Sequence, residues 1–235
     1  MPTDSVADCL PSRLPAEGAD VGKLVLRTFP SNIISKRGRD PLSNHVCRFP
    51  EIIKADGTIA GYISSEFDSQ HAYTLTTSKS SALQVNLPST SPFGASFNIL
   101  AVNGQDNRHP YLGAVGGGNG YRFGQGQRGS AFLTGTGASP ANSPPSSRGG
   151  TSMQSTGYNA PGESQIWSMD CKTREISAQW TNADSTQPET TIFYDTVDKY
   201  LGLTSDLEAF NVGPQDAHSV TFYFVPLINA SRTQF

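Results

Sequence analysis

Short segments that alternate between apolar and polar residues follow one another along most of the chain. His71–Thr76 and Ser81–Leu87 show the pattern clearly, because an apolar side chain stands at every second position. A period of two is that of a β-strand with one face in a core. Turn residues separate such segments at intervals of roughly 8–12 residues, which is typical of a protein built from many short strands. The strands expected are 23–29, 48–54, 58–64, 71–76, 81–87, 95–102, 111–115, 120–123, 130–134, 164–170, 175–180, 190–194, 200–203 and 219–225.

This succession of strands predicts one all-β domain, an antiparallel β-sandwich of the jelly-roll kind over residues 23–235. Residues 1–22 contain several Pro and Gly residues and little periodicity, so we expect an irregular N-terminal arm there. The Gly-, Ser- and Pro-rich stretch 135–150 is expected to be a long exposed loop. One short helix is expected near 205–211, where Ser205 and Glu208 form a capping-box pattern.

Turn residues and tryptophans indicate two hairpins in the expected sheet. Asp56-Gly57 lies between two apolar segments, which is a strong hairpin signal. Cys171–Thr173 is a short turn between the strands that carry Trp167 and Trp180. We therefore expect the two tryptophans to sit across a hairpin and to anchor the core.

The charge of the chain and the length of its apolar runs argue against two classes of partner. The formal net charge is -3, whereas a nucleic-acid-binding domain usually carries a basic stripe. The basic cluster 36–39 (KRGR) is expected to be a solvated loop. No apolar run is long enough to span a membrane. Neither nucleic acid nor a membrane is expected as a partner, and the oligomeric state stays open.

The N-terminal residues and the cysteines bear on the cellular compartment. The first residues lack the basic and apolar regions of a signal peptide. Cys9, Cys47 and Cys171 are widely spaced and odd in number, so at least one thiol stays unpaired within the monomer. We expect a cytoplasmic, reducing location, and non-classical secretion stays open.

Motifs for catalysis or metal binding are missing from the sequence. Gly124–Gly129 (GQGQRG) matches a dinucleotide fingerprint, but the expected strand 130–134 follows it where the fingerprint needs a helix. The four histidines lack metal-ligand spacing. We therefore expect no catalytic residue and no metal site. Four acidic loop residues could either ligate calcium or simply face water: Asp184, Glu189, Asp195 and Asp198.

The strongest candidate for a binding site is a segment that mixes aromatic residues, arginine and glycine. Aromatic rings stack on flat or conjugated ligands and on sugar rings, and a guanidinium group pairs with a ligand carboxylate. The other interpretation is that the aromatic rings fill the core and the arginines face water. The candidate ligand-binding residues are Arg108, His109, Tyr111, Tyr121, Arg122, Phe123 and Arg128.

Several short runs resemble a known group of sequences. Glu163–Ser168 (ESQIWS), Ala178–Asp184 (AQWTNAD) and Leu203–Asp206 (LTSD) follow one another in the order seen in a group of uncharacterised mushroom (basidiomycete) β-sandwich proteins. The resemblance covers about residues 55–225, and the tryptophan-containing runs are its most specific part. Within this group the chain is similar to the pink pigment-binding chromoproteins of oyster mushrooms. Ser185 and Ser205 replace residues of the group pattern at turn positions.

The resemblance implies a non-catalytic protein that holds an elongated, conjugated apolar ligand, a polyene pigment, without a covalent bond. The partner would then be a small hydrophobic molecule, held in a slot between sheets or beneath the Gly-rich loops. The alternative is a carbohydrate-binding lectin of a fungal fruiting body, with tyrosine and tryptophan stacking on sugar rings. A glycan-cleaving enzyme with two facing acids and a structural or storage protein are the other hypotheses.

Overall fold

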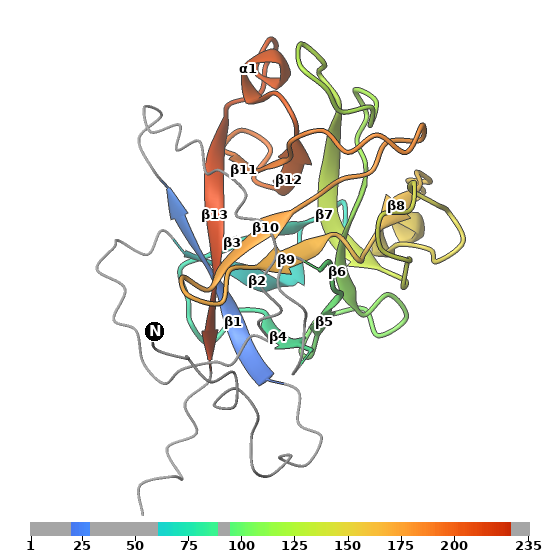
Figure 1. Cartoon of the computed structure of the whole chain (residues 1–235). Helices are drawn as coiled ribbons and strands as arrows, with labels where there is room; N and C mark the ends of the chain where they lie inside the picture. Colours follow the sequence, from blue (N-terminus) through green and yellow to red (C-terminus); the bar gives the residue numbers. More distant parts are fainter. Residues whose placement is uncertain (1–19, 29–60, 89–94, 227–235) are drawn as a thin grey trace, which may run out of the picture.

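Thirteen antiparallel strands form one continuous sheet (Figure 1). The computed structural model describes residues 20–28, 61–88 and 95–226. The strands are β1 Asp20–Thr28, β2 Gly61–Phe67, β3 Tyr73–Thr76, β4 Gln84–Leu87, β5 Ile99–Ala101, β6 Tyr111–Gly116, β7 Ser130–Thr136, β8 Gly162–Glu163, β9 Trp167–Met169, β10 Glu175–Ala178, β11 Thr191–Asp195, β12 Leu201–Thr204 and β13 Ala217–Pro226. A 3₁₀ helix, η2, spans Ser152–Thr156, and one α-helical turn, α1, spans Leu207–Phe210.

Eight of these strands close into a barrel, so the expectation of a sandwich or jelly roll is wrong. The ring runs β1-β4-β5-β6-β7-β12-β11-β13, and β13 pairs again with β1. Every pairing is antiparallel. A period-two pattern tells which face of a strand is buried, but it is the same in a sandwich and in a barrel. Closure depends on whether two distant edge strands meet, and local alternation carries no information about that.

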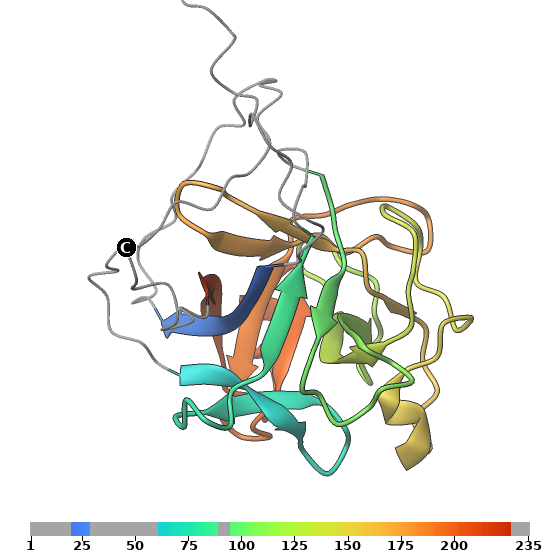
Figure 2. The ribbon, with the colours of Figure 1, turned by 90° about the horizontal axis from the view of Figure 1, so that it is seen from below.

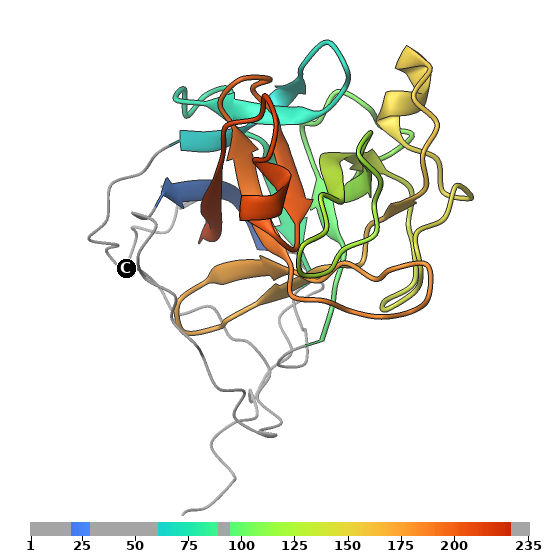
Figure 3. The same cartoon turned by 90° about the horizontal axis from the view of Figure 1, so that it is seen from above.

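Two pairs of strands extend the sheet beyond the barrel. β2 and β3 continue from β1, while β10 and β9 continue from β13. Figures 2 and 3 show these extensions on opposite sides of the barrel strands. The two-residue strand β8 lies off this path and pairs with β6.

The core combines aliphatic and aromatic side chains, and both tryptophans are completely buried in it, as the sequence predicts. Trp167 on β9 donates its indole N–H to the Leu112 carbonyl at 2.6 Å and stacks on Phe222, with ring centroids 6.1 Å apart. Trp180 follows β10 and does not stand opposite Trp167, because the residue paired with Trp167 is Ala178. The hairpin that carries them is confirmed. Trp167 contacts β6 and β13, whereas Trp180 contacts the loop after β6.

Several local predictions need correction. Residues 20–22 of the expected irregular arm belong to β1, which begins at Asp20, and the rest of that arm lies outside the described residues. No strand forms over 120–123, which lies in the connection between β6 and β7. The short helix is confirmed, but its N-cap is Asp206, whose side chain accepts from the Ala209 N–H at 2.9 Å, and not Ser205. The loop over 135–150 is confirmed from 137 onward, since β7 runs to Thr136.

Other predictions lie partly or wholly outside the described residues. These are the hairpin at 56–57, the basic cluster 36–39 and two of the cysteines, Cys9 and Cys47. Cys171, in the turn between β9 and β10, is disulfide-bonded. In the part of the chain that the structure describes, no helix has the length and apolar character needed to cross a membrane.

The stacking of Phe222 on Trp167 predicts a large effect of truncating Phe222. Phe222→Ala would leave a cavity in a completely buried site, and we expect a loss of about 3–5 kcal/mol in the free energy of unfolding. Val225→Ala on the same strand, at a side chain that is 44% exposed, should change it by less than about 1 kcal/mol. Urea unfolding followed by tryptophan fluorescence measures both values. Equal losses in the two variants would contradict this description of the core.

Candidate functional site

The seven residues predicted to bind a ligand do not form one site. Arg108, His109 and Tyr111 lie at the start of β6, whereas the other four lie in the loop after its end. Strand β6 contains six residues, and six residues of extended chain span roughly 17–20 Å. We expected one site because the seven residues are close along the chain, but the length of β6 separates the two groups in space.

The group after β6 is mainly structural. Phe123 is 2% exposed and stacks on Trp180, with ring centroids 5.2 Å apart. The carbonyl of Tyr121 accepts the indole N–H of Trp180 at 3.0 Å. Arg122 and Arg128 are exposed, and Arg122 forms an ion pair with Asp184 at 2.7 Å. The interpretation in which aromatic rings fill the core and arginines face water holds at this end of β6.

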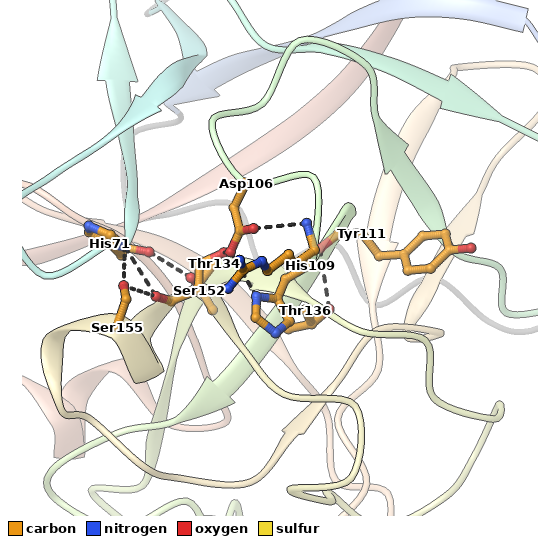
Figure 4. A network of polar contacts seen from close by, with 9 residues as sticks. His71, Asp106, His109, Tyr111, Thr134, Thr136, Ser152 and Ser155 are labelled. Carbon is orange, nitrogen blue, oxygen red and sulfur yellow. Dashed lines mark hydrogen bonds and ion pairs between the residues drawn. The ribbon is translucent and has the colours of Figure 1, made fainter.

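A network of polar side chains lies at the other end of β6 (Figure 4). It joins three segments that are far apart in the sequence: the turn between β2 and β3, the loop before β6, and η2. We call it the Asp106 network, and it consists of His71, Asp106, His109, Ser152 and Ser155.

Asp106 is the centre of this network. Its Oδ2 accepts from His109 Nδ1 at 2.7 Å and from the Ser152 hydroxyl at 2.8 Å. Its Oδ1 accepts from the backbone N–H of Arg108 at 2.9 Å. Partial burial alone would raise the pKa of Asp106, but these hydrogen bonds outweigh it and hold the pKa below its usual value. The carboxylate is therefore ionised at neutral pH.

The hydrogen bonds determine which nitrogen of each imidazole carries a proton. His71 Nδ1 lies 3.1 Å from the Ser152 carbonyl and 2.9 Å from the Ser155 hydroxyl, which itself donates to that carbonyl at 2.8 Å. A carbonyl only accepts, so His71 Nδ1 is the protonated nitrogen. The same holds for His109 Nδ1, which faces a carboxylate. In the neutral form both rings therefore keep Nε2 as a hydrogen-bond acceptor.

Backbone strain accompanies the network at His71. Its φ is 63°, a left-handed conformation that residues other than glycine rarely adopt. The conformation is held by a hydrogen bond from the Thr134 hydroxyl on β7 to the His71 carbonyl, at 2.6 Å. The ring also stacks on Phe67, with centroids 5.7 Å apart. Asn142, Arg174, Ser185 and Lys199 have a similar positive φ, so the strain fixes the orientation of His71 and does not by itself mark a functional site.

The serines of the network are not arranged for nucleophilic catalysis. In a Ser-His-Asp triad the imidazole lies between the hydroxyl and the carboxylate. Here Asp106 lies between Ser152 and His109, and the hydroxyl proton of Ser155 points to a backbone carbonyl. The contacts orient the side chains, and they do not form a hydroxyl–imidazole–carboxylate relay.

The sequence contained little that could have revealed this network. His71 and Ser155 touch across 84 positions of the chain, and only the folded barrel brings them together. The single local signal is the spacing of Asp106 and His109, three residues apart. The four loop acids discussed as a calcium site do not gather either, because the described residues contain no group of three His, Cys, Asp or Glu side chains placed to hold a metal.

The Asp106 network predicts an effect of adding a single methyl group at Gly150. Its φ is +68°, and a Cβ there would lie 2.6 Å from His109 Nε2 and 3.1 Å from Gln154 Oε1. Gly157 has a similar φ of +86° but open space around it. We expect Gly157→Ala to lower the free energy of unfolding by about 1 kcal/mol through backbone strain alone, and Gly150→Ala to lower it by at least about 1 kcal/mol more. Chemical unfolding of the two variants measures the difference, and equal losses would contradict the close packing of His109.

Comparison with known proteins does not assign a function to this site. No family model matches the chain, and no curated protein or solved structure is similar to it. A function for the Asp106 network therefore has to be argued from its own contacts.

Proposed function

We propose that the chain is a non-catalytic binding protein that takes a small polar ligand of the carbohydrate class at the Asp106 network. The observation that carries the proposal is the orientation of two imidazoles by hydrogen bonds at Nδ1. It leaves Nε2 of His71 as an acceptor for a ligand, while Nε2 of His109 packs close to Gly150. Sugar hydroxyls both donate and accept, so they suit a surface that offers fixed acceptors beside donors.

Arg108 supplies the donors for such a ligand. Its backbone N–H is bound to Asp106, which fixes the residue beside the network. Its side chain is exposed, and within the described residues the guanidinium group forms no ion pair. Five N–H donors in a rigid fork are thereby left for a ligand. Arg122, in contrast, is already paired with Asp184.

The ring of Tyr111 contributes less to this proposal than the sequence suggested. Figure 4 shows that its side chain points away from Asp106. Its backbone carbonyl accepts from the Thr136 hydroxyl at 3.2 Å, so the residue ties β6 to β7. Polar contacts rather than stacking therefore support the binding of a sugar here.

The expectation of a bound polyene pigment has weaker support. The runs on which the resemblance rests contain Trp167 and Trp180, whose buried side chains specify the fold. An elongated apolar ligand needs a long apolar slot. The pocket beside α1 is lined by Asp206, Glu208, Ala209 and Val212, and its two acids do not suit an apolar chain. Pigment binding is therefore an outcome to be tested and not the function we favour.

Removal of the Arg108 side chain tests the proposal. A glycan array identifies a ligand, and isothermal titration calorimetry then compares the wild type with Arg108→Ala. Loss of charge-assisted hydrogen bonds should weaken binding by roughly 10- to 100-fold. Arg128→Ala removes the same group at the other end of β6, and it should bind like the wild type.

Two results would contradict the proposal. One is the absence of glycan binding at millimolar concentration, and the other is equal weakening in both arginine variants. The visible spectrum of the protein purified from its natural source tests the rival directly. A polyene that co-purifies with the protein would establish pigment binding instead.

A further inference from the structure

A second acidic side chain, away from the Asp106 network, is buried in the barrel wall. Glu163 belongs to the short strand β8, which pairs with Ala114 and Val115 of β6. The residue is 2% exposed. Both of its carboxyl oxygens lie 3.2 Å from the backbone N–H of Thr181, which donates to them. A carboxyl group so deeply buried is rare unless it is paired with a charge.

The hydrogen bond from Thr181 connects the barrel to a loop of residues 181–187. The side chain of Asn182 in this loop accepts from the N–H of Phe123 at 2.7 Å and donates to its carbonyl at 2.9 Å. Asp184 in the same loop pairs with Arg122. The loop therefore supports the segment 121–123, and Glu163 is the point at which the loop is fastened to β8.

The surroundings of Glu163 offer little compensation for a negative charge. The elements packed against it carry Tyr111 on β6, Asp184 in the 181–187 loop, and Arg148 in the loop that bridges to β8 at Ser146. Asp184 is already paired with Arg122, and Arg148 is exposed. The pKa of Glu163 is set by burial, which raises it, and by the hydrogen bonds from Thr181, which lower it less.

We propose that the contact between Glu163 and Thr181 is a pH-sensitive clasp, which holds the 181–187 loop against the barrel in acid and releases it as the pH rises. Closing the loop buries the carboxyl group, and opening it lets water reach the group. The two states therefore bind a proton with different affinity, which is the requirement for a switch.

The direction and range of the switch follow from the two pKa values. Burial raises the pKa of Glu163 from 4.5 to about 8 in the closed state. In an open state that exposes the carboxyl group to water, the pKa returns toward 4.5. The free-energy difference that favours the closed state is largest below pH 4.5, and it decreases progressively between pH 4.5 and 8. Over that range the ratio of open to closed molecules rises by up to tenfold per pH unit.

Trp180 makes opening visible because it precedes Thr181 directly. Its indole is completely buried, stacks on Phe123 and donates to the Tyr121 carbonyl. Release of the loop would loosen all of these contacts at once. We therefore expect the tryptophan emission to shift to longer wavelength between pH 5 and pH 8.

Amide hydrogen exchange tests the clasp at Thr181 itself. After correction for the intrinsic pH dependence of exchange, protection of the Thr181 amide should fall by up to tenfold per unit from pH 5 to pH 8 in the wild type. Glu163→Gln keeps an uncharged hydrogen-bond acceptor and should remove this dependence. Glu189→Gln removes the same charge from an exposed position nearby and should behave like the wild type.

Two outcomes would overturn the clasp. One is pH-independent protection of Thr181 in the wild type, and the other is the same dependence in Glu163→Gln. If Glu163→Gln does not fold, the NMR titration of the Glu163 side-chain carbon in the wild type decides the question. A midpoint between pH 4.5 and 8 that coincides with loss of Thr181 amide protection supports the clasp. Titration without any loss of protection, or a midpoint near 4.5, refutes it. Neither result depends on whether the Asp106 network binds a ligand.

Discussion

The pairing of β1 with β13 is the contact on which the rest of the structure depends. Seven residue pairs, from Gly22↔Pro226 to Thr28↔Val220, join the first described strand to the last. Without this pairing the sheet would have two more free edges and no enclosed core. Gly22 is part of the reason that the strands fit, because a Cβ at this position would collide with the ring of Phe224.

Closure also determines where functional groups can lie. With β6 and β7 fixed in the ring, Thr134 on β7 reaches the carbonyl of His71, and Thr136 forms a bridge to Thr151, directly before η2. The Asp106 network is therefore built onto one side of a rigid hairpin. At the far end of the same hairpin, the loop after β6 is held by Trp180 and Asn182. A ligand of ordinary size contacts one of these ends and not both.

The sequence predicted local features well because each depends on neighbouring residues. Alternation in Ser81–Leu87 identified β4, and the tryptophans were correctly assigned to the core. Barrel closure depends on residues about 200 positions apart, so local pattern could not distinguish it from a sandwich. Phe123 illustrates the same limit, since its burial follows from a stack on Trp180 that no local pattern encodes. The Asp106 network was missed because its members come from three separate segments.

Two carboxyl groups of the same chemistry, Asp106 and Glu163, have opposite roles because their partners differ. Asp106 is partly exposed and accepts from an imidazole, a hydroxyl and a backbone N–H, so its pKa is lowered and it carries a charge at neutral pH. Glu163 is buried and accepts from the Thr181 backbone amide without a charged partner, so its pKa is raised. A charged, solvent-accessible group can orient donors toward a ligand. A neutral, enclosed group keeps its proton until the pH approaches its raised pKa.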